Sequence, residues 1–408
     1  MSSAAKVLIV GAGIGGLTAA IALGRRGIAT TVIERAGALA PAGAGITLQP
    51  NATAVLSAIG VGFDPSIAAP IGEVAMVDAR GRTFLAGGAI VDEAPSPGVT
   101  LRRTDLHRAL LAGCGPERVR LGVGLVGLED RPEGVIVRTS DGDEARWDLV
   151  IGADGLHSAV RRAILPAAAC APRPAGQTCW RLCVEAPELA PPITVERWTP
   201  GRRIGVVPLA RGGLYVYLVE SAAPGSVRPG SATIGELRRR FHGIDERLDA
   251  ILERAEGDPS TLVHHGELFD LPVYSSGRGR VVLIGDAGHA VTPNLGQGAA
   301  MAIEDAAALA LLGSRPGGLV DLPARLAAAR RRRVEAIHRT SWRLGQVAHW
   351  RSPIARWLRD ALLRAVPRRW SARAIAESWT PGFALAAEIR RSEVDAAGVE
   401  RPLARVGA

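Results

Sequence analysis

The segment from Lys6 to Arg35 constrains the fold of this chain more than any other part of it. It reads KVLIV-GAGIGG-LTAAIALGRRG-IATTVIER, which predicts a buried strand, a glycine turn, a helix and a second strand. Gly11 permits a tight turn, Gly13 lets a ligand approach the backbone, and Gly16 lets the helix pack on the strand. Glu34 ends the second strand, where a carboxylate can bind ribose hydroxyls. The spacing therefore predicts a βαβ unit that holds a dinucleotide pyrophosphate at the helix N-terminus.

Two later segments repeat the strand–turn–helix pattern and favour FAD over NAD as the dinucleotide. DLVIGADGLHSAVRR begins at Asp148, and GRVVLIGDAGHAVTPNLGQGAAMAIEDAAALALLG begins at Gly279. We therefore expect one discontinuous FAD-binding domain formed by 1–72, 99–175 and 275–323. The β-rich insertions 73–98 and 176–274 predict a substrate-binding β-sheet domain, and 324–408 is expected to be a helical segment. The expected class is α/β with α+β character, in which a Rossmann-like domain carries an interposed sheet and C-terminal helices.

Composition narrows the classes of function. An apolar content of 47% with 22% charged residues is typical of globular proteins, and no apolar stretch reaches the roughly 20 residues of a membrane helix. Lys6 is the only lysine, which argues against a P-loop or a Schiff-base mechanism. The four cysteines lack CxxC spacing and neighbouring histidines, so we predict neither a metal site nor a disulfide. The N-terminus lacks the layout of a secretion signal, and we expect a cytoplasmic protein.

Arginine and tryptophan are concentrated near the C-terminus. The stretch 324–373 holds 14 Arg against Glu335 and Asp360, a net charge of +12 in a chain whose total is +9. The tryptophans among them are Trp342, Trp350, Trp357 and Trp370. Their spacing predicts aromatic surface along one side of consecutive helices. We expect a solvated helical cap over the substrate entrance, with transient contact to an anionic membrane surface as the alternative. No nucleic-acid partner is expected, because no recognised binding motif accompanies the arginines.

Taken together, the motifs resemble the single-component FAD-dependent aromatic hydroxylases, the family of the p-hydroxybenzoate, salicylate and 6-hydroxynicotinate hydroxylases. The resemblance runs from Lys6 to about Leu312 through GAGIGG…ER, RTDLH, GADG and GDAGHAVTPNLGQGAAMAIEDA. It implies a fold of the p-hydroxybenzoate hydroxylase type and noncovalent FAD. It also implies reduction by NADH or NADPH, and transfer of one atom of O2 to an electron-rich ring through a flavin C4a-hydroperoxide. We expect a monomer or weak homodimer that acts on a small aromatic molecule.

The same resemblance assigns the FAD contacts by position. Those on the diphosphate and adenosine side are Gly11, Gly13, Gly16, Glu34, Arg35, Arg103 and the backbone of Val126. Those on the flavin side are Asp286 and the turn residues Pro293, Gly296, Gln297, Gly298 and Ala299. The start of the following helix would favour negative charge on the edge of the reduced flavin.

The interposed sheet supplies the expected substrate pocket. Arg203 matches a position that contacts substrate or the peroxide oxygen in a related hydroxylase, and Tyr215 matches its pocket tyrosine. Arg181 and Tyr217 are further candidates; a surface arginine or a core aromatic is the alternative for each. His264 is the candidate base, because imidazole titrates near working pH, and a structural role is its alternative. We expect purely structural roles for the remaining polar residues near the motifs, Asp154, His289, Glu304 and Asp305.

A narrower resemblance concerns the substrate. GAGITLQPNA, GQTCWRLCV, LVHHGEL and the HWRSP tail are similar to quinolone monooxygenases that act on 2-heptyl-4-quinolone or in aurachin biosynthesis. This implies a 4-quinolone with a lipophilic tail, oxygenated at C3 or across C2 and C3. We expect the tail to lie among Val206, Val207, Leu214 and Val216.

Other functions stay open at this point. A salicylate- or hydroxynicotinate-type hydroxylase would need an arginine clamp for a carboxylate, for which Arg181 and Arg203 are the candidates. A geranylgeranyl-reductase-like flavoprotein would share the FAD motifs without consuming O2, and a flavin-binding adaptor would show no turnover. A flavin halogenase is disfavoured, because it would need an active-site lysine and a paired tryptophan motif.

Overall fold

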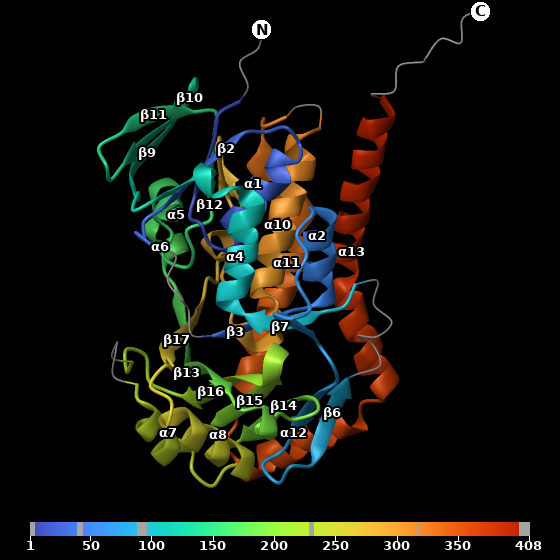
Figure 1. The fold of residues 1–408 in the computed structure, drawn as a ribbon. Coiled ribbons are helices and arrows are strands. Elements are labelled where there is room, and N and C mark those ends of the chain that lie inside the picture. Colours follow the sequence, from blue (N-terminus) through green and yellow to red (C-terminus); the bar gives the residue numbers. More distant parts are fainter. Residues whose placement is uncertain (1–4, 39–43, 88–95, 228–231, 316–317, 400–408) are drawn as a thin grey trace, which may run out of the picture.

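The computed structural model describes residues 5–38, 44–87, 96–227, 232–315 and 318–399. All predicted domain segments except 99–175 include a few residues outside these ranges. Two large β-sheets lie at opposite ends of the molecule, and long helices run between and beside them (Figure 1). The prediction of a mixed α/β class is confirmed.

The N-terminal βαβ unit lies in a six-stranded sheet of order β18-β19-β12-β1-β2-β8. Its strands are β1 (Val7–Val10), β2 (Thr30–Glu34), β8 (Val119–Leu121), β12 (Leu149–Gly152), β18 (Gly277–Arg278) and β19 (Val281–Leu283). Parallel pairing joins β1 to β2 and β12, and β12 to β19. β1, β12 and β19 are buried at every position, as parallel strands covered on both faces require. Segments far apart in the sequence thus form one sheet.

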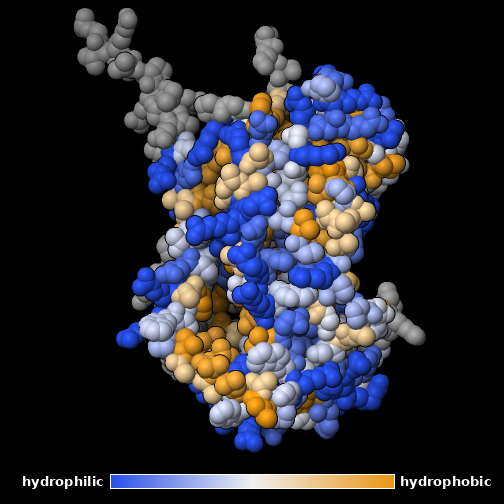
Figure 2. Space-filling model, turned by 180° about the vertical axis from the view of Figure 1, so that it is seen from behind, coloured by the Kyte–Doolittle hydropathy of each residue, from blue (hydrophilic) through white to orange (hydrophobic). Residues whose placement is uncertain are grey.

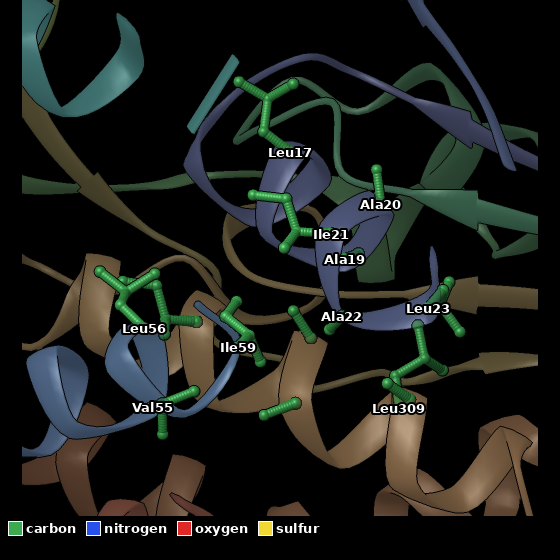
Figure 3. Packing of buried hydrophobic residues seen from close by; sticks show 14 of the residues in the cluster. Leu17, Ala19, Ala20, Ile21, Ala22, Leu23, Val55, Leu56, Ile59 and Leu309 are labelled. Carbon is green, nitrogen blue, oxygen red and sulfur yellow. The ribbon is translucent and has the colours of Figure 1, made fainter. Parts of the chain in front are cut away.

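Helices cover this sheet and build the main hydrophobic core. They are α1 (Ile14–Gly24), α2 (Pro50–Ala58), α4 (Arg103–Cys114) and α10 (Gly298–Gly313). Leu23 of α1 and Leu309 of α10 belong to this core, as do Val55 and Leu56 of α2 (Figure 3). Alanines fill most of the facing positions on α1 and α10, which lets the two helices pack closely.

Smaller elements complete the upper part of the molecule. β3 (Gly45–Leu48), β7 (Val99–Arg102) and β4 (Ala68–Pro70) form one three-stranded sheet. β9 (Leu125–Arg131), β10 (Gly134–Thr139) and β11 (Glu144–Trp147) form another. The short helices are α5 (Ala159–Ile164), α6 (Ala167–Cys170), α9 (Asp286–His289), η1 (Pro116–Arg118) and η4 (Pro293–Leu295).

The second large sheet contains both predicted β-rich insertions. Its order is β17-β13-β16-β15-β14-β5-β6. The strands are β5 (Val74–Val77), β6 (Thr83–Gly87), β13 (Arg173–Glu185), β14 (Thr194–Thr199), β15 (Arg202–Pro208), β16 (Gly213–Ser221) and β17 (His264–Asp270). β14 pairs in parallel with β5 and so joins the two insertions. Between strands lie η2 (Pro187–Leu189) and η3 (Ala210–Gly212). Two helices absent from the sequence analysis, α7 (Ile234–Phe241) and α8 (Glu246–Glu256), cover one face.

Three helices form the C-terminal segment, as far as it is described. α11 (Leu322–Ala348) packs against α10, and α13 (Arg368–Val399) runs along α2 and α10. α12 (Pro353–Ala365) lies at the second sheet, against β6. Within the described residues, no helix combines the length and apolarity needed to cross a membrane.

Candidate active site

The glycine turn between β1 and α1 is fixed by packing at two positions and open at a third. Gly11 has φ 106° and donates its N–H to the carbonyl of Ile33 (2.8 Å), a conformation that suits glycine. A Cβ on Gly16 would lie 1.9 Å from the carbonyl oxygen of Gly11, so only glycine fits there. A Cβ on Gly13 would meet no atom within 4 Å. The backbone at Gly13 therefore faces open space, which fits the close approach of a pyrophosphate.

Glu34, at the end of β2, lies directly beside this turn. Its Oε2 accepts the N–H of Ala12 (2.9 Å), and its Oε1 accepts the N–H of Ala36 (3.0 Å). A carboxylate offers about four lone-pair positions, so two backbone bonds leave room for ribose hydroxyls. Arg35 and Val126, the other residues expected on this side, are both exposed.

Asp286 and Arg103 provide opposite charges further along the site. Asp286 is the first residue of α9 and follows Gly285, which has φ 56°. Its side chain is exposed. The protein atoms around it nevertheless limit hydration of the carboxylate and raise its pKa, and this effect exceeds the lowering of the pKa by His289 and Arg103. The carboxylate thus reaches solvent although protein atoms surround it. Arg103 is the exposed first residue of α4, and its charge acts on Asp286 and on His264. This pair fits the polar middle of an extended dinucleotide.

The turn before α10 presents backbone donors. Pro293 opens η4, and Gly296 adopts the left-handed conformation (φ 62°, ψ 21°). Gln297 is the N-cap of α10, so Gly298 and Ala299 lie in its first turn. First-turn N–H groups have no acceptor within the helix, and the helix dipole makes this end positive. The geometry fits the electron-rich edge of a flavin.

Gln49, which the sequence analysis did not assign, holds this turn in place. Its Nε2 donates to the carbonyl of Leu295 (2.7 Å), while its Oε1 accepts from Trp379 (2.8 Å) and from Gln297. Asn51 donates to the Gln297 side chain as well (3.1 Å). The only local signal was the position of Gln49 in GITLQPN, because its partners lie more than 240 residues away.

A buried ionic cluster anchors α10 beneath the site. Arg330 of α11 contacts Glu304 and Asp305 at 2.8 Å each, and His289 bonds the same aspartate at 2.5 Å. Burial alone would raise the pKa of Asp305, but His289 and Arg330 outweigh burial and hold it far below its ordinary value. Asp154 has a comparable role at α5, where its carboxylate accepts the Ser158 hydroxyl and the N–H of Ala159. These acids are bound by protein groups, in agreement with the structural roles expected for them.

The five candidate pocket residues share one face of the second sheet. Side chains alternate along a strand, and Trp180, Leu182, Leu214 and Val216 face α7 and α8. The opposite face carries Arg181, Arg203, Tyr215, Tyr217 and His264, since Arg181 pairs with His264 and Arg203 alternates with Ile204. Tyr215 packs against Gly45 of β3, where a Cβ would lie 2.4 Å from the ring. This face is therefore turned toward the first domain.

Arg181, Tyr215 and His264 form a polar group on this face. Burial raises the pKa of Tyr215, so its phenol stays protonated despite the neighbouring Arg181. Burial, Arg181 and Arg103 together lower the pKa of His264. The imidazole is therefore neutral at pH 7 and free to accept a proton. Tyr217 differs, because its hydroxyl donates to the carboxylate of Glu196.

Arg203 is buried in a hydrogen-bond network, with 3% of its surface exposed. It donates to Oδ1 of Asn294 in η4 (2.5 Å), to Nε2 of His349 (3.1 Å) and to Oε1 of Gln177 (3.5 Å). Burial, followed by the charge of Arg203, lowers the pKa of His349 to about 3, so this histidine is neutral and accepts the bond. His349 stands in the HWRSP tail, where the sequence analysis gave it no role.

One expectation about apolar residues is wrong, and another holds for only part of its residues. Val206, Leu214 and Val216 do not line the inner face, because they pack with α7 and α8 in the outer core. Of the four tail tryptophans, Trp342 is not part of the expected exposed aromatic surface. Trp342 is half-buried under the guanidinium of Arg173, which lies 3.5 Å from its ring centre, whereas the other three are exposed.

Comparison with known sequences identifies the family. The FAD binding domain family matches residues 4–312. The chain is 37% identical to aurachin C monooxygenase/isomerase of Stigmatella aurantiaca, over 89% of this chain and 95% of that protein. It is also 37% identical to 2-heptyl-3-hydroxy-4(1H)-quinolone synthase of Pseudomonas aeruginosa, over 88% of this chain and 94% of the synthase.

A solved structure confirms the expected fold type. The Klebsiella pneumoniae protein HpxO, complexed with FAD and uric acid, superposes with a TM-score of 0.83 at 27% identity. The match covers 94% of this chain and 98% of HpxO. The resemblance drawn from the motifs is thereby confirmed for fold and family.

Proposed function

Because this chain belongs to the family of FAD-dependent aromatic monooxygenases, we propose that it oxygenates a 4-quinolone with a lipophilic tail, at C3 or across C2 and C3. The overall reaction consumes one O2 and one NADH or NADPH. One oxygen atom enters the ring and the other leaves as water. The nicotinamide supplies both electrons as a hydride, and one proton from solvent completes the water. Reduced nicotinamide is a cytoplasmic reagent, and we place the protein there.

The proposal assigns FAD to the region between the glycine turn and the second sheet. When bound, FAD supplies the redox chemistry that connects nicotinamide oxidation to oxygen transfer. We assign the diphosphate and adenosine side to Gly11, Gly13, Gly16, Glu34, Arg35, Arg103 and Val126. We assign the flavin side to Asp286, Pro293, Gly296, Gln297, Gly298 and Ala299. The support is the open space at Gly13, the exposed carboxylate of Asp286 and the first-turn N–H groups at the start of α10.

The quinolone proposal rests on the burial of Arg203 and on the hydrogen bonds that its guanidinium already makes. A carboxylated substrate such as salicylate would need an arginine clamp on the inner face of the sheet. The guanidinium of Arg203 is already bound by Asn294, His349 and Gln177 and is almost fully buried. Only Arg181 remains as a candidate clamp. A neutral ring is the better fit, and both relatives at 37% identity support it by their names.

We propose that His264 accepts the proton of the quinolone N–H or hydroxyl. Its lowered pKa keeps the imidazole neutral at pH 7, and Arg181 beside it would steady the negative charge that develops on the ring. Tyr215 lies on the same face as a protonated hydrogen-bond donor. Changing His264 to Gln should lower kcat about 10²-fold, the contribution typical of a general base, and remove the acidic limb of the pH–rate profile. An unchanged profile would exclude His264 as the base.

The decisive experiment compares substrates on the holoenzyme. We expect 2-heptyl-4-quinolone to stimulate NADH or NADPH oxidation with O2 uptake and to give a product heavier by one oxygen atom. Salicylate is the matched carboxylated ring. Coupled turnover with salicylate and none with any 2-alkyl-4-quinolone would refute the substrate while leaving the monooxygenase family intact.

Arg203 acts, in this proposal, as a positioning residue for the turn before α10. Replacing Arg203 by Gln should leave FAD bound but lower the fraction of oxidised NADH that yields product. Asn294→Ala should have a weaker effect in the same direction, and the double variant should be no worse than Arg203→Gln alone, because removing Arg203 already breaks its bond to Asn294. Additive losses would show that the two residues act separately. Arg202→Gln on the same strand, which breaks an ion pair with Glu220, is the matched control.

A further inference from the structure

α12 is held to the protein by a narrow inner face. Arg359, with 4% exposed, donates to the carbonyls of Val347 (3.1 Å) and Ala348 (3.3 Å) at the end of α11. Its guanidinium also lies 5.0 Å from the ring of Trp198 in the second sheet. Leu363 packs into the small cluster around that tryptophan. The orientation of α12 is therefore fixed by Arg359, by Leu363 and by the ion pair of Arg364 with Asp78 (2.8 Å).

The outer face of the same helix is its most apolar side, and it is exposed. Large apolar side chains recur along it at spacings of three and four residues. They are Ile354 (78% exposed), Trp357 (70%), Leu358 (49%), Leu362 (60%) and Val366 (41%), flanked by Trp350 (40%) and Trp370 (62%). We call this set the α12 stripe. Figure 2 shows hydrophobic surface at the lower left, the side to which the half turn brings α12. A contiguous patch of this kind marks an interaction site.

The charges around the stripe have one sign. Between Trp350 and Trp370 the sequence holds six arginines and a single acid, Asp360. The carboxylate of Asp360 is bound by Arg359 at 2.7 Å. Arg351 and Arg369, beyond the two ends of α12, are exposed. Two of the six arginines are paired, Arg359 with Asp360 and Arg364 with Asp78. The stripe is thus an apolar surface flanked by the exposed positive charges of Arg351 and Arg369.

We propose that the α12 stripe docks the enzyme on the surface of an anionic lipid bilayer. A helix of 13 residues is about 20 Å long and lies flat in the headgroup region with its apolar side down. Tryptophan prefers the membrane interface, and arginines there reach lipid phosphates. A second copy of the chain fits less well, because two-fold pairing of the stripe would bring Arg351 and Arg369 toward like charges without an exposed acid in the segment. The proposal concerns this surface alone and holds for any ring substrate.

The test measures vesicle binding by the full FAD-loaded chain. Flotation is compared between vesicles of phosphatidylcholine and vesicles containing 30% phosphatidylglycerol, with light scattering to follow the oligomeric state. We expect binding that is stronger on the anionic vesicles and that weakens with salt. Ile354→Ser with Leu362→Ser should weaken binding at least tenfold. Replacing Arg351 and Arg369 by Gln should cost about fivefold per charge on anionic vesicles, and little on neutral ones.

The matched control replaces two exposed apolar residues elsewhere, Val320 (66% exposed) and Leu262 (54%), by Ser. This variant should bind like the unmodified chain. Equal loss in both double variants, or no binding by the unmodified chain to either vesicle, would overturn the proposal. So would a dimer that dissociates in the Ile354/Leu362 variant while no vesicle binding occurs. FAD absorbance and thermal melting confirm that each variant is folded.

Discussion

Gly13 and Gly16 stand three residues apart in one turn, yet a side chain would have different consequences at each. At Gly13 the backbone is extended (φ −75°, ψ −175°) and the added Cβ would meet no protein atom within 4 Å. We therefore predict that Gly13→Leu folds, at a cost of less than about 1 kcal/mol for a less favourable N-cap, but loses FAD because the side chain occupies the pyrophosphate space. The ratio of flavin to protein absorbance after gel filtration checks this.

Gly16→Ala is the informative comparison. Its Cβ would lie 1.9 Å from the Gly11 carbonyl oxygen, so the turn itself must move. We expect this variant to be less thermally stable even as apoprotein, whereas the apoprotein of Gly13→Leu should melt close to the unmodified apoprotein. Full flavin occupancy in Gly13→Leu would contradict the assignment of this turn to FAD.

His349 makes stability depend on pH. Its pKa is about 3 in the folded protein, against an ordinary value of 6.5, because burial and Arg203 oppose its protonation. Between these values the unfolded chain binds a proton that the folded chain does not. Stability from this group is therefore complete above pH 6.5 and is lost as the pH falls, by about 1.4 kcal/mol per pH unit. Urea unfolding at pH 7, 6 and 5 measures this slope.

His349→Gln should flatten the slope by that amount, since glutamine can accept from Arg203 and donate to Ser221 without titrating. His242 is the matched control, because its side chain is 81% exposed. His242→Gln should leave the slope unchanged. An equally steep slope in His349→Gln would mean that other groups govern the acid limb.

At the scale of elements, α10 is attached to α11 by charges with no access to water. Arg330 is 3% exposed and contacts both Glu304 and Asp305. Removing it leaves two buried carboxylates short of a partner, so Arg330→Met should lower the free energy of unfolding by about 3–5 kcal/mol. Arg339→Met on the same helix is the control: that side chain is 61% exposed, and the loss should stay below about 1 kcal/mol. Chemical denaturation of both variants at pH 7 measures the two losses in the free energy of unfolding.

The local sequence predicts well those elements whose formation depends on residues close together in the chain. The glycine turn, β13 to β16 and the start of α10 follow from residue spacing, and each is present where expected. α7 and α8 were missed although they are amphipathic, because each is short, 8 and 11 residues, and shows only two to four buried positions. Val206, Leu214 and Val216 were assigned to the wrong face, since alternation shows which residues share a face and not which face meets the other domain. Val207 pairs with Tyr215 and does lie on the inner face.

The polar linkages of the site were beyond prediction for a different reason. Arg203 and His349 are 146 residues apart, and Gln49 and Trp379 are 330 apart. Nothing near either partner indicates the other, because each pair forms only after α11 and α13 have packed. Arg203 was singled out by resemblance, but its burial and its bond to Asn294 are properties of the assembled fold.

At the scale of the whole molecule, FAD should act as a stabilising ligand. Its expected contacts come from three separated segments and exist together only in the folded chain. Free FAD at 100 times its Kd should therefore stabilise the fold by about 2.7 kcal/mol and raise the melting temperature with concentration. Differential scanning calorimetry of apoprotein titrated with FAD tests this. Gly13→Leu should show no such rise, and a similar rise in both would place FAD elsewhere.

The order of strands in the first sheet has a consequence for biosynthesis. β1 pairs with β12, which pairs with β19, so Val7 lies beside Leu149 and Val150 beside Val281. Such neighbours form long loops that must close before the sheet exists, and topologies of this kind fold slowly. While the ribosome is still producing the middle of the chain, β1 has only β2 to pair with. Its other edge stays unpaired until β12 has been synthesised. The expected FAD site is thus a late product of synthesis, and incomplete chains expose strand edges to aggregation and to chaperones.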